Sequence, residues 1–239
     1  MEILSVDLAH TAYCNIGIVG LEMNRQGLEV RTLAPAQFGL MGAPSPTQLA
    51  DALADACERL GVKILLMDGP QGWKDPQNGL THSRICERIL NTPGKTGLPG
   101  VTKPANYLAF TTFSVSVFHS LVASGFRLFG GPTSQRLLVE SFPLSAWKQL
   151  KLLPLPAKGK AKSTDLLRAS ADLGRLFQVA IPEGLSHDEL QALVAAFAGV
   201  ALVCGDTLGY APAGAAPTMI EGTWREGFIV NPTRKAIAR

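Results

Sequence analysis

The chain has few of the features that mark secreted, membrane or zinc-binding proteins. Its 239 residues include four cysteines, scattered without a C-x-x-C pair or a cluster of histidines. Neither a disulfide framework nor a zinc site is therefore expected. No apolar run approaches the roughly 18 residues of a membrane span, and no basic segment followed by an apolar stretch opens the chain as in a signal peptide. We expect a cytoplasmic protein with reduced, mostly buried thiols and no membrane partner.

Charge and missing motifs exclude further classes. Charged residues make up 17% of the chain and hydrophobic residues 46%, which is typical of a globular protein rather than a disordered one. The net charge of +3 permits contact with nucleic acid but falls short of the dense basic face of a dedicated binder. The sequence lacks a P-loop, a dinucleotide-binding glycine fingerprint and a G-x-S-x-G elbow. Chemistry that depends on these motifs is not indicated.

The order of apolar patterns predicts an α/β fold. Apolar runs joined by short turns predict three antiparallel strands, at residues 3–8, 13–23 and 28–33. Continuous apolar runs predict two buried parallel strands, at residues 63–67 and 136–139. Helical spacing and capping signals predict helices at residues 47–60, 83–90, 108–124, 144–150, 164–177 and 187–203. A late edge strand is expected at residues 222–230.

A meander followed by alternating helices and strands is the ribonuclease H-like topology. It gives a mixed five-stranded sheet with helices on both faces, whereas a Rossmann chain would begin with strand, helix and strand. We expect one domain over residues 1–239. Residues 71–106 form a long insertion within it, and irregular segments of that length inside a compact domain tend to be functional.

Three of the predicted strands run into an acidic residue: Asp7, Asp68 and Glu140. Functional groups of α/β sheets gather where the parallel strands end, and in this topology Asp7 and Asp68 should be neighbours. Clustered carboxylates repel one another unless a cation intervenes, and oxygen ligands of this kind suit Mg²⁺ or Mn²⁺. A pair of such ions can promote phosphodiester hydrolysis. The alternative is that each acid caps a strand end or pairs with an arginine.

The last helix offers a further acid. Nucleases of this fold commonly carry the pattern D-x-x-D-A there, and this chain has Asp188 at the first position but Gln191 at the second. Glutamine supplies no negative charge to a metal, so the pattern is incomplete. Asp188 and Glu189 also have an ordinary explanation, because acids in a first helical turn complement the helix dipole.

Basic and aromatic residues near these acids are candidates for holding a substrate. Arg84 and Arg88 are four residues apart on a short predicted helix, where they could face a phosphate or pair with acids. Lys160 belongs to a basic loop that could follow a nucleic-acid backbone or simply be solvated. Trp73 and Tyr107 could stack on a base or anchor the insertion to the core.

Several short stretches together carry a resemblance to a known family. They are Val6-Asp7, Met67-Asp68-Gly69-Pro70, Arg84-x-Cys86-Glu87-Arg88, Val139-Glu140-Ser141-Phe142-Pro143 and His187-Asp188-x-x-x-Ala192. With them the chain, from residue 1 to about residue 230, resembles the domain-of-unknown-function family numbered 429, which is regarded as a family of predicted nucleases with the ribonuclease H-like fold. The resemblance implies Asp7 and Asp68 as metal ligands, with Glu140 and Asp188 as additions, and Gln191 departs from the nuclease pattern.

The leading hypothesis is a Mg²⁺- or Mn²⁺-dependent nuclease with nucleic acid as its partner. Its catalytic residues would be Asp7, Asp68, Glu140 and Asp188, its metal ligands Asp7, Asp68 and Asp188, and its substrate-binding residues Arg84, Arg88 and Lys160. A non-catalytic binding domain is the first alternative, favoured by Gln191. An ATP-using phosphotransferase of the actin-like superfamily is the second, although the loop after the first strand offers one threonine, Thr11, and no glycine.

Overall fold

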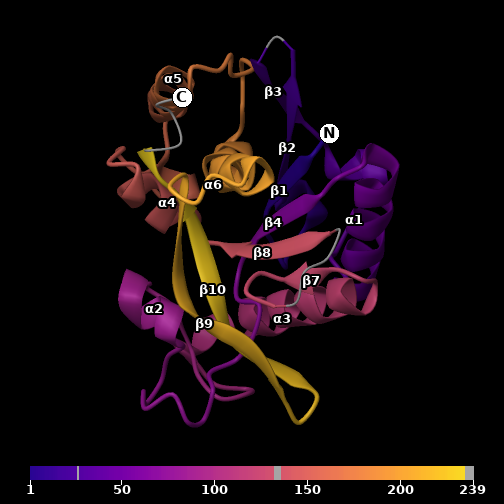
Figure 1. The fold of residues 1–239 in the computed structure, drawn as a ribbon, viewed down its shortest axis with the longest axis vertical. Coiled ribbons are helices and arrows are strands. Elements are labelled where there is room, and N and C mark those ends of the chain that lie inside the picture. Colours follow the sequence, from indigo (N-terminus) through magenta and orange to yellow (C-terminus); the bar gives the residue numbers. More distant parts are fainter. Residues whose placement is uncertain (26, 132–135, 235–239) are drawn as a thin grey trace.

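The computed structural model describes residues 1–25, 27–131 and 136–234, and its centre is one mixed eight-stranded sheet (Figure 1). The strands are β1 (Ile3–Asp7), β2 (Gly17–Asn24), β3 (Gly27–Thr32), β4 (Ile64–Asp68), β7 (Arg127–Leu128), β8 (Leu137–Ser141), β9 (Tyr210–Ile220) and β10 (Thr223–Pro232). Their order is β3-β2-β1-β4-β8-β10-β9, and β7 pairs with β8.

The first five strands of this path confirm the ribonuclease H-like fold. Strands β1, β2 and β3 pair antiparallel as a meander, while β4 pairs parallel with both β1 and β8. This is the predicted central position of β1 with β4 beside it. The hairpin of β9 and β10 extends the sheet beyond β8, because β10 pairs parallel with β8 and antiparallel with β9.

Helices cover both faces of the sheet, as predicted (Figure 1). They are α1 (Pro46–Leu60), α2 (Ile85–Leu90), α3 (Leu108–Ala123), α4 (Pro143–Gln149), α5 (Ser163–Phe177) and α6 (His187–Cys204). Short 3-10 turns are η1 (Tyr13–Asn15), η2 (Pro35–Phe38), η3 (Ala105–Tyr107) and η4 (Lys158–Lys160). One core lies under α1 and α3, and the other lies under α4, α5 and α6.

The alternation of side chains along the central strands divides these two cores. Leu4 and Val6 of β1 belong to the core under α1 and α3, whereas Ile3 belongs to the core under α6, because successive strand residues point to opposite faces. Helix α6 lies very close to the sheet: a Cβ on Gly199 would come within 2.7 Å of Ile3 and 2.8 Å of Leu66. Any side chain at that position would push the helix away.

Helix α6 is the central helix of the fold. By length and composition it could cross a membrane, but 61% of this apolar stretch is buried inside the protein, as in a core helix. Its N-terminus forms the predicted capping box: Ser186 Oγ accepts from Glu189 N at 3.2 Å, and Glu189 Oε2 accepts from Ser186 N at 2.7 Å.

Several expectations about the elements need correction. The second strand begins at Gly17 rather than residue 13, because Tyr13 starts the turn η1 and is buried. The strand expected at the sheet edge is β10, which lies between β8 and β9. The edge strand beyond it, β9, and the short strand β7 were not predicted, and the sheet has eight strands rather than five. The short turn expected between the second and third strands includes residue 26, which lies outside the described residues. Of the four thiols, Cys14 and Cys204 are exposed.

The insertion at residues 71–106 is tied firmly to β10. It contains α2, η3 and a two-stranded sheet of β5 (Lys95–Thr96) and β6 (Thr102–Lys103). The buried carboxylate of Glu226 accepts hydrogen bonds from Asp75 N at 3.1 Å, from Ile85 N at 2.8 Å and from the Asn78 side chain. These three hydrogen bonds fix the path of the insertion across β10.

Candidate active site

Asp7 and Asp68 lie side by side where β1 and β4 end. The preceding residues, Val6 and Met67, are register partners in the parallel pair, and the two carboxyl groups are close enough to influence each other's pKa. Burial, followed by repulsion from Asp68 and Asp188, raises the pKa of Asp7 well above its usual range. Burial, followed by repulsion from Glu140, raises the pKa of Asp68 to about 7. Both side chains keep partial contact with solvent.

Asp188 joins these acids because α6 begins directly over the end of β1. Gly17, the β2 partner of Asp7, makes this possible, since a Cβ there would lie 2.2 Å from the carbonyl carbon of Asp188. Burial opposes the charge of Asp188, but hydrogen bonds from His187 and Lys158 outweigh it and hold the pKa of this carboxyl below its ordinary value. The His187 Nδ1 atom lies 3.3 Å from Asp188 Oδ1.

Lys158 brings a positive charge into the acidic cluster. Its ammonium group forms an ion pair with Asp188 and donates a hydrogen bond to Asn15 Oδ1 at 3.0 Å. Its charge also opposes the rise in the pKa of Asp7. Lys160, the predicted substrate-binding lysine, is exposed on the same turn η4. The structure therefore brings Lys158 rather than Lys160 to the acids, and nothing in the sequence K-G-K distinguishes the two.

Glu140 is paired with Arg84 and, unlike Asp7 and Asp68, is buried away from solvent. The guanidinium donates from Nη1 to Glu140 Oε2 at 2.7 Å and from Nη2 to Oε1 at 2.6 Å. Arg84 Nε donates to Glu87 Oε1 at 3.1 Å, so its donors are occupied by acids rather than left for a phosphate. Burial raises the pKa of Glu140, and Arg84 opposes that rise. Arg88 is exposed on α2.

Gln191, which stands in the second acidic position of the nuclease pattern, faces helix α4 instead. Its Oε1 atom accepts a hydrogen bond from Trp147 Nε1 at 2.7 Å. Trp147 is fully buried, and a buried indole N–H needs an acceptor. The glutamine therefore contributes to the packing of α4 against α6, and the incomplete acidic pattern has a structural cause.

Asp7 and Asp68 at this edge fit one divalent ion. Among the described ranges of the chain, no group of three or more His, Cys, Asp or Glu side chains is placed to hold a metal. Asp7 and Asp68 suffice for a single Mg²⁺, which usually binds one or two carboxylates and completes its shell with water and phosphate oxygens. Burial, followed by repulsion from neighbouring carboxylates, raises the pKa of both groups. The other two acids are already neutralised, Asp188 by Lys158 and Glu140 by Arg84.

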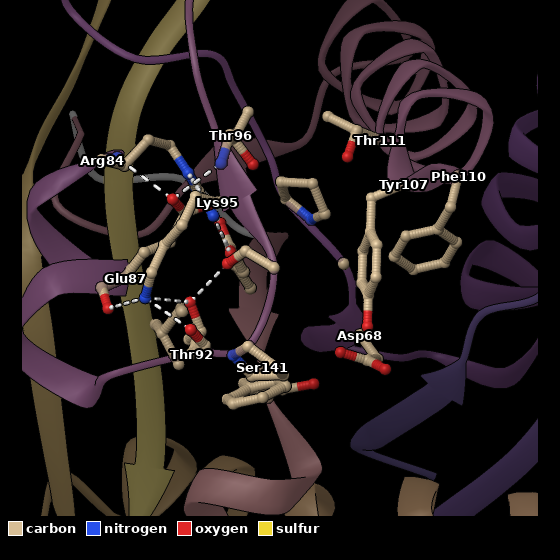
Figure 2. Close-up of a pocket in the computed structure, with 17 residues that line it drawn as sticks. Asp68, Arg84, Glu87, Thr92, Lys95, Thr96, Tyr107, Phe110, Thr111 and Ser141 are labelled. Carbon is tan, nitrogen blue, oxygen red and sulfur yellow. Dashed lines mark hydrogen bonds and ion pairs between the residues drawn. The ribbon is translucent and has the colours of Figure 1, made fainter. Parts of the chain in front are cut away.

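A cavity of about 240 Å³ adjoins Asp68 (Figure 2). It lies between the insertion and the first turn of α3, and its lining includes Lys95, Tyr107, Phe110 and Ser141. Of these, sequence reasoning considered only Tyr107. The others carried no recognisable signal, because the cavity is assembled from segments that lie far apart in the sequence. Trp73, the other candidate for stacking, is 6% exposed and anchors the insertion.

Comparison with known proteins adds little to this description. No protein-family model and no curated protein sequence matches the chain. Two solved structures of Thermus thermophilus RuvC are similar to it, one of them in complex with a Holliday junction substrate. Both are 12% identical over 90% of this chain, cover 99% and 98% of the RuvC chain, and have TM-scores of 0.37 and 0.39. The fold assignment rests on the strand order and not on these similarities.

Proposed function

We propose that the protein is a divalent-metal-dependent nuclease that hydrolyses phosphodiester bonds of nucleic acid. The observation that carries this proposal is the pair of neighbouring carboxylates, Asp7 and Asp68, at the end of two parallel strands. Burial and repulsion raise the pKa of both groups, and such shifts are common at functional sites. The pair is partly exposed and adjoins an open cavity, so a phosphate can approach it.

Asp7 and Asp68 would hold one Mg²⁺ or Mn²⁺ ion. When bound, such an ion neutralises charge on phosphate oxygens and lowers the pKa of water. Asp188 positions Lys158 at the same edge, where the ammonium group supplies a second, fixed positive charge for the phosphate. Glu140 acts indirectly, because its ion pair with Arg84 holds the insertion against β8 and so shapes the cavity beside Asp68.

The remaining expectations from the sequence belong to this proposal as well. We propose a single domain that works in the cytoplasm and is a member of the domain-of-unknown-function family 429. The exposed Lys160 and Arg88 remain candidates for contacts with the nucleic-acid backbone, which would be recognisable as a weakening of binding at raised salt.

A cleavage assay tests the proposal. Labelled single-stranded and double-stranded DNA and RNA are incubated with the protein in Mn²⁺ or in EDTA. We expect cleavage in Mn²⁺ only, and its loss in Asp7→Asn and Asp68→Asn. Asp51→Asn, an exposed aspartate of α1, is the matched control and should cleave normally. Cleavage that survives in Asp7→Asn would contradict the proposed site. Binding of nucleic acid without any cleavage would favour the non-catalytic binding domain instead.

A further inference from the structure

The cavity beside Asp68 has the size and the walls of a site for one small planar group. Its volume of about 240 Å³ is below the roughly 300–1,000 Å³ of sites for drug-sized ligands. Tyr107 of η3 and Phe110 of α3 form an aromatic wall, and Tyr107 is 37% exposed. In Figure 2 the Tyr107 side chain extends toward Asp68. A flat ring that stacks here would therefore lie next to the proposed catalytic acids.

The walls of this cavity are held in place in the absence of a ligand. A Cβ on Gly94 would lie 2.8 Å from Cδ1 of Tyr107, so the backbone of the insertion packs directly against the tyrosine ring and fixes it. On the opposite side, Glu87 accepts hydrogen bonds from Arg84 N at 3.1 Å and Thr96 N at 2.8 Å. These contacts connect α2 to β5, and the site is preformed, as ligand pockets usually are.

Ser141 and Lys95 are the polar residues of the lining that bear on what the cavity could bind. Ser141 is 2% exposed, and among the described residues its Oγ has no hydrogen-bond partner, although buried polar groups nearly always have one. The ammonium of Lys95 donates to three neutral oxygens, namely the carbonyl of Glu87 at 3.1 Å, the carbonyl of Thr92, and Thr92 Oγ1 at 3.4 Å. The lining therefore offers one buried hydroxyl without a partner, and Lys95 adds a positive charge to the same lining.

We propose that the cavity receives one unpaired nucleobase. The base stacks on Tyr107, Ser141 forms a hydrogen bond with its edge, and its phosphate lies between Lys95 and the pair of Asp7 and Asp68. This inference rests on the proposed nuclease function and names its substrate class. A base inside a duplex cannot enter, because its edge is paired and its faces are stacked. Stacking on an aromatic ring tolerates any base, so we expect little sequence preference.

The test measures binding separately from cleavage. The whole protein is titrated in EDTA against three probes that contain the fluorescent base 2-aminopurine: a single-stranded oligonucleotide, the same strand in a blunt duplex, and the free nucleotide monophosphate. We expect a change in fluorescence with the single strand and none with the duplex. Equal binding of the duplex would overturn the proposal. If the free nucleotide binds as tightly as the strand, the natural source is a small nucleotide, and tighter binding of the strand indicates a polynucleotide.

Variants connect the binding to the cavity. Tyr107→Ala should weaken binding of the single strand by about ten-fold, the scale of one base–aromatic stack, while Tyr107→Phe keeps the ring and should bind as the wild type does. Tyr210→Ala is the control, since Tyr210 packs on Phe129 outside the cavity lining. Should Tyr107→Ala melt at a lower temperature than the control, Ser141→Ala is used in its place and should weaken binding several-fold.

The outcomes separate this inference from the proposed function. If binding depends on Tyr107 but the protein cleaves no nucleic acid, the result supports the base site and overturns the proposed nuclease function. Cleavage that depends on Asp7 but is unchanged in Tyr107→Ala supports the nuclease and overturns the base site. Wild-type affinity in both Tyr107→Ala and Ser141→Ala also overturns it.

Discussion

Arg84 and Glu140 form a bidentate ion pair in the interior of the protein, with nitrogen–oxygen distances of 2.7 and 2.6 Å. The two residues are 56 positions apart in the sequence, and they are only 1% and 2% exposed. The pair removes Glu140 from the set of acids that a metal could use. It also joins the insertion to β8, so one contact both limits the metal site and shapes the cavity beside it.

Breaking this pair should destabilise the protein strongly. We expect Arg84→Met to lower the free energy of unfolding by about 3–5 kcal/mol, because it leaves a buried carboxylate without its partner. The double variant Arg84→Met/Glu140→Leu should recover much of that loss, since apolar residues of similar volume often replace a buried ion pair without cost. Urea unfolding measures both. The exposed Arg88→Met is the control and should change the value by no more than about 0.5 kcal/mol; an equal loss in that variant would refute a special role for Arg84.

The raised pKa of Asp68 predicts how stability depends on pH. Without metal, the Asp68 carboxyl group of the folded protein stays protonated up to about pH 7. In the unfolded chain an aspartate loses its proton near the ordinary pKa of about 3.9. The contribution of Asp68 to stability is therefore fully present below about pH 4 and is lost as the pH rises through about 7. Asp68→Asn should melt at a higher temperature than the wild type at pH 8 in EDTA. A lower melting temperature for Asp68→Asn than for the wild type at pH 8 would show that the ionised Asp68 carboxylate does not destabilise the folded protein.

The two lysines of η4 should behave differently. Lys158→Met removes the positive charge beside Asp7 and Asp188, so we expect Mn²⁺ to bind several-fold more tightly while cleavage becomes slower. Lys160→Met should leave the affinity for Mn²⁺ close to that of the wild type, because the ion pair with Asp188 is made by Lys158. Calorimetric titration and single-turnover cleavage measure the two effects. Weaker binding of Mn²⁺ by Lys158→Met would mean that this lysine supports the metal site rather than competing with it.

Gln191 should matter for stability and not for metal binding. Gln191→Leu leaves the buried indole N–H of Trp147 without an acceptor, which should cost about 1–3 kcal/mol of unfolding free energy. Gln191→Glu retains an acceptor and should cost less. Neither variant should alter the affinity for Mn²⁺, because Gln191 faces Trp147. Loss of Mn²⁺ binding in Gln191→Leu would place this side chain at the metal instead.

The sequence predicted those parts of the fold that depend on local patterns. Apolar runs joined by short turns located β1 and β3, continuous apolar runs located β4 and β8, and capping signals located the start of α6. Since a parallel pair aligns its strand ends, the proximity of Asp7 and Asp68 followed from topology. Strand β9 was missed because Pro212, Gly214 and Pro217 are typical of loops. Prolines are tolerated at the edge of a sheet, and β9 is the edge strand.

The partners of the acids could not be predicted in the same way. Arg84 and Glu140 meet only because the insertion folds back over β8, and Lys158 reaches Asp188 from a turn whose lysines look alike in the sequence. These contacts join distant segments, and a single sequence carries no signal for such pairings. The charged pair Arg225-Glu226 within the apolar β10 was the one visible hint that a strand residue is engaged elsewhere, and Glu226 does bind the insertion.

Titration of the protein with Mn²⁺ at pH 8 tests the central claim most directly. This pH is above the Asp68 pKa of about 7, so the carboxyl group is ionised and can bind a cation. Isothermal titration calorimetry should show one Mn²⁺ ion per chain, and the same titration of Asp7→Asn or Asp68→Asn should show no binding. No binding by the wild type, two ions per chain, or a site that survives in both variants would contradict the account.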